Sequence, residues 1–466
     1  MKPFLKLTGC QPRIHGLEFK HPVNWELYPG QTWAIVGDNG AGKSVLADMI
    51  RGKYALKSGK IIYSFLEGSD KGVWQAVQML SFDSVYGVAD FRNAYYQQRW
   101  HSSENDDMPS VMDIIGEIAD SKAIDLFDIS GLLEKKVNFL SSGELRKFLI
   151  TRTLIQKPDL LIIDNPYIGL DIKSREILNS ALRELCRMKG IHIIFIFSST
   201  EHIPDFVTHI LPVEKMEAKS TLTYKEFIAS GQKAVLEEYP LKITSGESTN
   251  AVALLNNITI KYGGKIVLSG IDWNIHKGEK WVLLGQNGSG KSTLLSLINA
   301  DHPQAYSNDI TIFGKKRGVG QSIWEIKKHI GYISPEMHTH YYQNISAIDV
   351  VGSGFYDTIG TVNRCSPEQE AKSLKWMQRM GISHLRDKSF MKLSSGEQRL
   401  VLLARTFVKE PEMLILDEPL HGLDDRNKQL VREIIDDYVE KNNTTLIYVS
   451  HYMNELPRAI NRRKDL

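Results

Sequence analysis

One glycine-rich octapeptide determines the fold, and the chain contains it twice, as Gly37-Asp38-Asn39-Gly40-Ala41-Gly42-Lys43-Ser44 and as Gly285-Gln286-Asn287-Gly288-Ser289-Gly290-Lys291-Ser292. Both copies fit the pattern G-x-x-x-x-G-K-[ST]. Each follows a short apolar run that predicts a buried strand and precedes a stretch with helical apolar spacing. This order places backbone N–H groups around an anion at a helix N-terminus. We therefore predict two phosphate-binding loops, with Thr293 included in the second.

Within these loops, particular side chains have predicted roles. Lys43 and Lys291 would reach the β- and γ-phosphates of a nucleotide, and Ser44 and Ser292 would ligate Mg²⁺. Asp164 and Asp417 each end a buried apolar strand, where a lone carboxylate is costly unless it is paired or linked to a metal. We expect both aspartates to belong to Mg²⁺ sites.

Three further motifs repeat in the same order, each 253 positions later. They are Leu140-Ser141-Ser142-Gly143-Glu144 with Leu393-Ser394-Ser395-Gly396-Glu397, Leu160–Asp164 with Met413–Asp417, and Gly169–Asp171 with Gly422–Asp424. The order and spacing indicate a duplication. We predict a first domain at residues 1–215, a linker at 216–250 and a second domain at 251–466. Alternating strand and helix patterns predict a mainly parallel sheet flanked by helices in each domain.

Length and composition limit the class of protein. The chain has 466 residues with 57 Lys and Arg against 55 Asp and Glu, a net charge of +2, and 42% hydrophobic residues. The balanced charge argues against a large basic nucleic-acid surface, so we expect no nucleic-acid partner. The sequence lacks an apolar run near 18 residues, a signal peptide and a metal-binding cysteine spacing, and we expect a cytoplasmic location.

The Leu-Ser-Ser-Gly-Glu segments resemble the signature sequence of ATP-binding cassette (ABC) ATPases. The stretches Pro166–Asp171 and Pro419–Asp424 resemble the D-loops of the same family, and the resemblance covers both halves. The resemblance implies that the protein binds ATP together with Mg²⁺ and hydrolyses the ATP. It also implies two P-loop NTPase domains, each with antiparallel edge strands and a helical subdomain.

In this family two cassettes pair head to tail, so that each ATP lies between one phosphate loop and the other signature segment. The resemblance therefore implies pairing within the chain. The first site would be closed by Ser394, Ser395 and Gly396, and the second by Ser141, Ser142 and Gly143.

The two sites differ where the family places its water-activating carboxylate. The second copy has Glu418 there and the first has Asn165, whose amide cannot accept a proton. His451 matches the family's switch histidine, which contacts the γ-phosphate. In the first copy we place Ser199 at that position, and the nearest histidine, His202, follows three residues later. Tyr262 resembles the adenine-stacking aromatic, and its counterpart is Ile14. We predict hydrolysis at the second site, with Lys291, Glu418 and His451 as its catalytic residues.

Two features bear on the biological role. The family usually has a glutamine near the end of one strand. Asp83 stands there in the first copy and Pro335-Glu336 in the second, so this part of the sequence does not support coupling to a membrane partner. The stretch Ala300–Ser334 resembles a group of tandem-cassette proteins assigned to molybdenum transport or photorepair. That resemblance implies a separate membrane permease and a position on the inner face of the cell membrane.

Two alternatives remain open at this stage. A tandem sugar-importer ATPase would share the two-cassette layout. A non-transport ATPase acting on ribosomes or nucleic acid is the contrasting class, although residues 216–250 are short and mixed in composition compared with the charged helical linkers of such proteins.

Overall fold

The structure is a computed structural model and describes residues 1–82, 109–116, 121–137, 140, 142–188, 190–201, 203–231, 237–241, 243, 250–262, 265–320, 322–335, 337, 344–359 and 364–466. The chain divides into two compact units. The first contains Met1–Val85, Met108–Val235 and Gly422–Arg426, and the second contains Tyr86–Asp107, Leu236–His421 and Asn427–Leu466.

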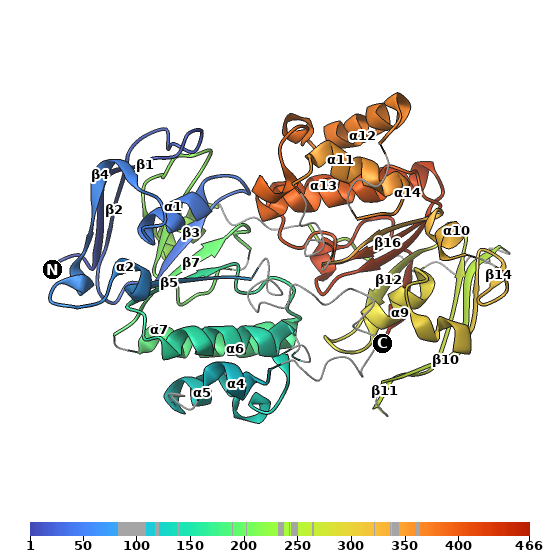
Figure 1. The fold of residues 1–466 in the computed structure, drawn as a ribbon, viewed down its shortest axis with the longest axis horizontal. Coiled ribbons are helices and arrows are strands. Elements are labelled where there is room, and N and C mark those ends of the chain that lie inside the picture. The colour runs from blue at the N-terminus through green and yellow to red at the C-terminus, as the bar shows by residue number, and fades with distance from the viewer. Residues whose placement is uncertain are drawn as a thin grey trace. The chain divides into compact units, whose positions relative to one another are not determined.

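The first unit is built on a six-stranded sheet in the order β5-β6-β7-β3-β8-β9, in which every pair is parallel except β8 with β9 (Figure 1). Its strands are β3 (Trp33–Val36), β5 (Val77–Ser81), β6 (Leu160–Asp164), β7 (His192–Phe197), β8 (His209–Pro212) and β9 (Leu222–Thr223). All residues of β3 and β6 are buried, as expected for strands whose two faces are both covered.

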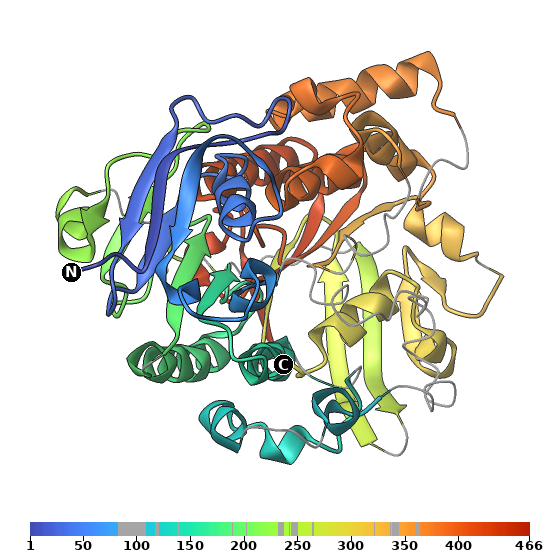
Figure 2. The same ribbon diagram turned by 60° about the vertical axis from the view of Figure 1, so that its left-hand side comes forward.

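An antiparallel sheet accompanies it, in the order β2-β1-β4. Its strands are β1 (Leu5–Pro12), β2 (Val23–Leu27) and β4 (Leu56–Tyr63), which Figure 2 shows in blue. The buried residues of β1 and β2 share one hydrophobic core with β3 and with the first helix. This core fixes the loop between β3 and that helix.

The helices of the first unit are α1 (Lys43–Ile50), α2 (Val73–Ala76), α4 (Val111–Ile115), α5 (Ser121–Phe127), α6 (Ser142–Ile155), α7 (Ile172–Arg187) and α8 (Tyr224–Ala229). Helix α5 packs against α6 and α7. Strand β9 and helix α8 lie within the predicted linker 216–250 and contact β8. The domain boundaries themselves stay a prediction.

The second unit has a five-stranded parallel sheet in the order β15-β16-β17-β12-β18. Its strands are β12 (Lys280–Leu284), β15 (Ile330–Ile333), β16 (Met413–Asp417), β17 (Thr445–Val449) and β18 (Arg462–Asp465). The antiparallel sheet follows the order β11-β10-β13-β14, with β10 (Ala251–Tyr262), β11 (Lys265–His276), β13 (Asp309–Ile312) and β14 (Lys315–Lys316).

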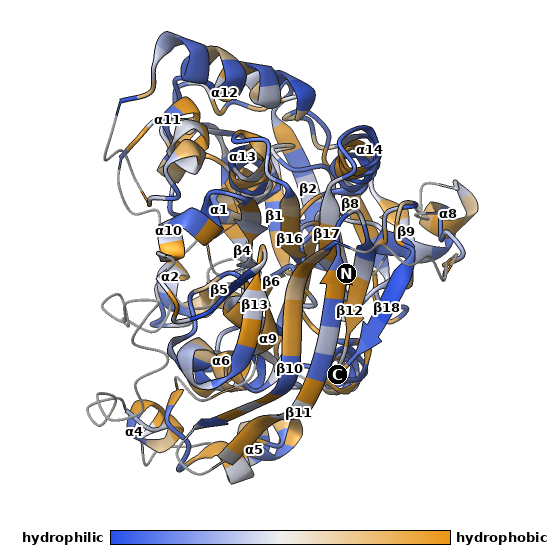
Figure 3. Cartoon of the chain, turned by 90° about the vertical axis from the view of Figure 1, so that its right-hand side faces the viewer, coloured by the Kyte–Doolittle hydropathy of each residue, from blue (hydrophilic) through white to orange (hydrophobic). Residues whose placement is uncertain are grey.

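The helices of the second unit are α9 (Lys291–Ile298), α10 (Ile323–Lys327), α11 (Ala347–Gly352), α12 (Pro367–Arg379), α13 (Ser395–Phe407) and α14 (Asp425–Lys441). Helices α11, α12 and α13 pack against one another beyond the sheet. Helices α12 and α14 present polar residues, shown in blue in Figure 3, on the side away from their buried apolar positions.

The predicted α/β fold in two copies is confirmed, with mainly parallel sheets, flanking helices and antiparallel strands. One strand of the second unit has no apolar pattern in the sequence. Strand β18 pairs with β12 in parallel, just as β8 pairs with β3. Its sequence, Arg462-Arg463-Lys464-Asp465, is polar throughout (Figure 3). A search for apolar runs therefore does not identify it as a strand. Within the described residues, no helix is both long and apolar enough to cross a membrane.

Candidate functional site: two nucleotide sites with different side chains

Both phosphate loops connect a buried strand to a helix, β3 to α1 and β12 to α9. Gly42 and Gly290 cap these helices with φ of 108° and 96°, a left-handed conformation that favours glycine. A Cβ atom on either glycine would lie 2.6 Å from a neighbouring side chain, Met216 Sδ in the first unit and Leu268 Cδ2 in the second. The backbone conformation thus favours glycine at this position, and a larger residue would also displace a neighbouring side chain.

The two loop lysines have the same hydrogen bonds. Lys43 Nζ donates to the carbonyl oxygens of Gly37 at 2.6 Å and Asp38 at 2.8 Å. Lys291 Nζ donates to those of Gly285 at 2.7 Å and Gln286 at 2.9 Å. Both lysines are buried. The loops therefore hold their cations within the curve of the backbone, where a phosphate would be neutralised.

The remaining predicted loop residues lie between strand and helix in each unit: Asp38, Asn39, Gly40, Ala41 and Ser44 in the first, and Gln286, Asn287, Gly288, Ser289 and Ser292 in the second. Thr293 is buried in the first turn of α9.

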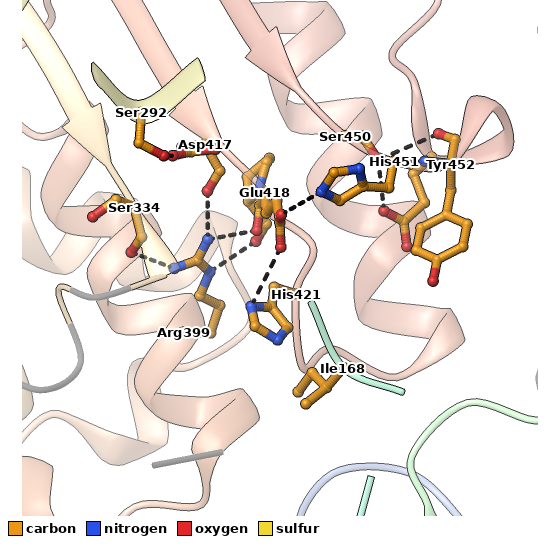
Figure 4. Close-up of polar contacts among 12 residues, drawn as sticks. Ile168, Ser292, Ser334, Arg399, Asp417, Glu418, His421, Ser450, His451 and Tyr452 are labelled. Atoms are coloured by element: carbon orange, nitrogen blue, oxygen red, sulfur yellow. Dashed lines mark hydrogen bonds and ion pairs between the residues drawn. The ribbon is translucent and has the colours of Figure 1, made fainter. Parts of the chain in front are cut away.

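The parallel sheet brings Mg²⁺-type ligands together in the second unit. Ser292 Oγ donates to Asp417 Oδ2 at 3.3 Å, because the loop after β12 and the end of β16 meet at the same edge of the sheet (Figure 4). A hydroxyl and a carboxylate are oxygen ligands that suit Mg²⁺. In the first unit, Asp164 likewise ends β6 and is buried.

Glu418 directly follows Asp417 in an unusual backbone conformation. Its φ is 47°, in the left-handed region, and its N–H donates to the carbonyl of Val449 at 3.0 Å. Nε2 of His451 lies 3.0 Å from Oε1 of Glu418, and Nδ1 of His421 lies 3.7 Å from Oε2 (Figure 4). Both carboxylate oxygens thus face imidazole nitrogens.

The electrostatic surroundings keep Glu418 ionised. Burial raises the pKa of Glu418, but the hydrogen bond with His451 and the electrostatic effect of His421, His451 and Lys291 outweigh it and hold that pKa at about 2. A carboxylate in this state accepts hydrogen bonds and attracts positive charge across the neutral pH range.

Asn165 occupies the same backbone position in the first unit. Its φ is also 47°, and its N–H donates to the carbonyl of Ile196 at 2.9 Å. Its side chain is held by two bonds: Nδ2 donates to Asp164 Oδ1 at 3.0 Å, and Oδ1 accepts the N–H of Ser198 at 3.2 Å. The amide is therefore a link between strand ends.

Strand register corrects one residue assignment. Asp164 pairs with Ile196 across β6 and β7, and Asp417 pairs with Val449 across β16 and β17. Two residues beyond these partners stand Ser198 and His451, so Ser198 is the counterpart of His451. Our placement of Ser199 there was wrong by one position, although the 253-residue offset of the later motifs already relates His451 to Ser198. His202 lies outside the described residues.

Arg399 is a structural residue that the sequence reading missed. It is fully buried on α13, and its guanidinium donates to four backbone carbonyls, those of Ser334 at 2.9 Å, Asp417 at 3.1 Å, Glu418 at 2.6 Å and Pro419 at 3.0 Å (Figure 4). Burial lowers its pKa to about 10. Its counterpart Arg146 donates to the carbonyl of Ile168. The shared 253-residue offset was the signal that could have found both.

The second signature segment begins α13. Ser394 is its N-cap, with its N–H donating to Glu397 Oε2 at 2.8 Å and its Oγ accepting the N–H of Glu397 at 3.4 Å. This capping box leaves Ser395 and Gly396 in the first turn of the helix. In the first unit Ser142 and Gly143 begin α6, whereas Ser141 lies outside the described residues.

The other predicted site residues have mixed outcomes. The hydroxyl of Tyr262 is paired with Nε2 of His302, and its half-buried ring packs against the core of the second unit. Burial raises the pKa of Tyr262 and lowers that of His302 to about 4. Adenine stacking on Tyr262 stays a prediction. Asp83 and Glu336 lie outside the described residues.

Comparisons with known proteins agree with this geometry. The sequence profile of the ABC transporter family matches residues 20–168 and 268–421. The chain is 35% identical to the ABC transporter ATP-binding protein ModF of Escherichia coli, covering 94% of this chain and 92% of ModF. It is 31% identical to an uncharacterized ABC transporter ATP-binding protein of Schizosaccharomyces pombe, covering 95% and 94% of the two chains.

The fold is similar to a solved structure of ribosome-bound archaeal Pelota and ABCE1, with a TM-score of 0.60 and 17% identity. The match covers 97% of this chain and 75% of that one. At this level of identity the likeness concerns the fold alone.

Proposed function

This chain belongs to the ABC transporter family and is a tandem ABC ATPase that uses ATP with Mg²⁺, and on that premise we propose that its two sites have different tasks. The site built on Lys291, Asp417, Glu418 and His451 hydrolyses ATP. The site built on Lys43, Asp164 and Asn165 binds ATP and hydrolyses it slowly.

The observation that supports this division is the residue after each strand-terminal aspartate. Glu418 and Asn165 share a φ of 47° and the same backbone hydrogen bond to the neighbouring strand, so the side chains alone differ. An ionised carboxylate orients and polarises an attacking water, whereas a neutral amide does so far less. The bonds of Asn165 to Asp164 and Ser198 also occupy both ends of its amide.

The lowered pKa of Glu418 keeps its side chain a carboxylate near neutral pH. Such a carboxylate is a weak base, and it acts by holding and polarising the water as charge develops rather than by removing a proton beforehand. His451 and His421 fix its direction from two sides. Mg²⁺, which neutralises the phosphate charge when bound, would be held by Ser292 and Asp417 in the second cassette and by Ser44 and Asp164 in the first.

Pairing within the chain completes the proposal. By the family pattern, Ser394, Ser395 and Gly396 would close the first site, and Ser141, Ser142 and Gly143 would close the second. The residue ranges 1–215 and 251–466 would be the paired cassettes, joined by residues 216–250.

For the biological role we propose the ATPase component of a transport system with a separate membrane permease. The support is the resemblance to ModF, whose name describes an ABC transporter ATP-binding protein, at 35% identity over nearly the whole chain. A molybdenum-type cargo follows from that resemblance alone. The protein would then lie in the cytoplasm, on the inner face of the membrane.

Purification of the untagged complex from its own cells tests this role. A transport function predicts a stoichiometric integral membrane protein that stays with the chain in mild detergent. Co-sedimentation with ribosomes, with no membrane protein retained, would contradict transport. A sugar-importer permease in the complex would keep transport and replace the proposed cargo.

A further inference from the structure

Arg317 is a buried cation at the edge of the second unit with no carboxylate partner among the described residues. It directly follows edge strand β14, and only 4% of its surface is exposed. Its Nη2 donates to the hydroxyl of Tyr306 at 3.3 Å, whereas its Nε and Nη1 are buried and meet no acceptor in the part of the chain that the structure describes. Buried unsatisfied donors on a charged group are costly, so this arrangement needs a reason.

Exposed apolar side chains lie in the same segment of the chain as this arginine, and one of them, Tyr306, contacts it. The exposed fractions are 58% for Tyr306, 69% for Val319 and 55% for Trp324, all large for such residues. The guanidinium carbon of Arg317 lies 5.0 Å from the ring centroid of Tyr306, which therefore covers it. An ion pair between Lys315 of β14 and Glu325 of α10 ties the arginine's strand to the helix that carries Trp324 (Figure 1).

The charges around this region identify the kind of ligand. Three lysines of this region are paired, Lys315 with Glu325 at 3.9 Å, Lys316 with Asp309 at 2.8 Å and Lys327 with Asp301 at 2.5 Å, and one exposed lysine, Lys328, has no ion pair among the described residues. A nucleic-acid track would offer a row of unpaired cations to successive phosphates. Here the buried cation without a carboxylate is a single arginine, which matches a single carboxylate.

We propose that Tyr306, Arg317, Val319 and Trp324, here called the Arg317 surface, form a docking site for an acidic segment of a partner protein. One Asp or Glu carboxylate of the partner pairs with the Nε and Nη1 groups of Arg317 once the Tyr306 ring turns aside. Trp324 and Val319 pack against apolar residues on either side of that carboxylate. Tryptophan, tyrosine and arginine are the residues that dominate binding energy in protein interfaces.

This inference stands independently of the ATPase division. The Arg317 surface includes none of the phosphate-loop, Mg²⁺-binding or signature residues. Loss of docking would leave hydrolysis unchanged, and loss of hydrolysis would leave docking unchanged, so the two proposals fail separately.

Photo-crosslinking of the full chain in living cells tests the surface. The photoreactive residue benzoylphenylalanine replaces Val319, and in a matched control it replaces Trp74, an exposed tryptophan on α2 of the first unit. We expect position 319 to yield one protein adduct that position 74 does not, with an Asp or Glu in the crosslinked peptide mapped by mass spectrometry.

Substitutions then establish the role of the arginine. Arg317→Met, which retains much of the buried volume, should lower the adduct yield at least about tenfold, since truncating one partner of a buried charge pair costs affinity strongly. Trp324→Ala, an exposed substitution that does not threaten folding, should lower it as well. Arg317→Glu combined with Lys at the mapped partner acid should restore the adduct. ATPase activity of each variant verifies its fold.

Several outcomes would overturn the proposal. An adduct destroyed by nuclease would identify a nucleic-acid partner, and an adduct between two copies of this chain would identify self-association. A crosslinked peptide that contains no Asp or Glu, or the absence of any adduct at position 319, would also contradict the proposal. A yield that Arg317→Met and Trp324→Ala both leave unchanged would also contradict it.

Discussion

The two cassettes share a backbone at the end of their central strands and differ in the side chains that it carries. Asn165 and Glu418 both have a φ of 47° and donate the same hydrogen bond to the neighbouring strand. In the second cassette the carboxylate faces His451 and His421, and in the first the amide links Asp164 to Ser198. The difference teaches that a duplicated scaffold can keep its backbone and phosphate loop while the side chain after the strand-terminal aspartate changes from a carboxylate to an amide.

Substitution of the strand-end residue should have the largest effect. Glu418→Gln is expected to lower steady-state ATPase activity about 100-fold or more, because the amide cannot polarise water as the carboxylate does. Asn165→Gln is the matched control and should change activity less than about twofold. Comparable losses in both variants would break the comparison, since they would place hydrolysis at both sites.

Removal of the buried arginine should follow in size. Arg399→Met removes the guanidinium donor from four carbonyls, of which those of Ser334 and Glu418 keep a backbone N–H, and we expect the free energy of unfolding to fall by about 3–5 kcal/mol. Urea unfolding measures this loss. Arg399→Lys keeps the charge but not the planar guanidinium. Its free energy of unfolding should lie between those of Arg399→Met and the parent protein. A loss below about 1 kcal/mol for Arg399→Met would contradict the proposed role.

The free energy of unfolding should depend on pH through His302, a residue of the second cassette. Burial lowers the pKa of His302 to about 4 from 6.5, so the folded chain excludes a proton that the unfolded chain binds. The free energy of unfolding should therefore fall as pH drops from about 6.5 to about 4, by about 3 kcal/mol for this group.

The first cassette carries Tyr54 at the corresponding distance from its phosphate-loop lysine. His302→Gln should accordingly flatten the pH profile of unfolding measured by denaturant titration. An identical profile in parent and variant would show that His302 does not contribute.

The smallest expected effect concerns the adenine. Tyr262→Ala should weaken ATP binding about tenfold by loss of aromatic stacking, and Tyr262→Phe should keep most of the affinity, because the ring stays and only the bond to His302 is lost. Ile14→Tyr would place an aromatic ring at the corresponding position of the first cassette, and we expect it to raise the affinity of that site for ATP. Nucleotide titration by calorimetry measures all three, and equal affinities for Ala and Phe at position 262 would argue against stacking.

Much of the fold and site could be predicted from the sequence, because both depend on local patterns. Glycine loops, apolar strand runs and their constant offset identified the repeat, and Glu418 and Asn165 were recognised from their position next to an aspartate.

What could not be predicted depends on pairing and burial. The polar β18 lacked an apolar pattern, and Arg399 shows its role only once four distant carbonyls meet its side chain. Arg317 was similarly hidden, since a Lys-Lys-Arg run indicates an exposed turn, whereas the arginine is buried. The misplacement of Ser199 was avoidable, since the 253-residue offset relates His451 to Ser198.

The central claim is that only the second site turns over rapidly, and nucleotide trapping on the intact chain tests it most directly. The protein is incubated with Mg²⁺ and a photoreactive, α-labelled azido-ATP, irradiated after several turnovers, and cleaved to separate the two halves. The account predicts labelled triphosphate on the half that carries Lys43 and labelled diphosphate on the half that carries Lys291. Diphosphate on both halves in equal proportion would contradict it.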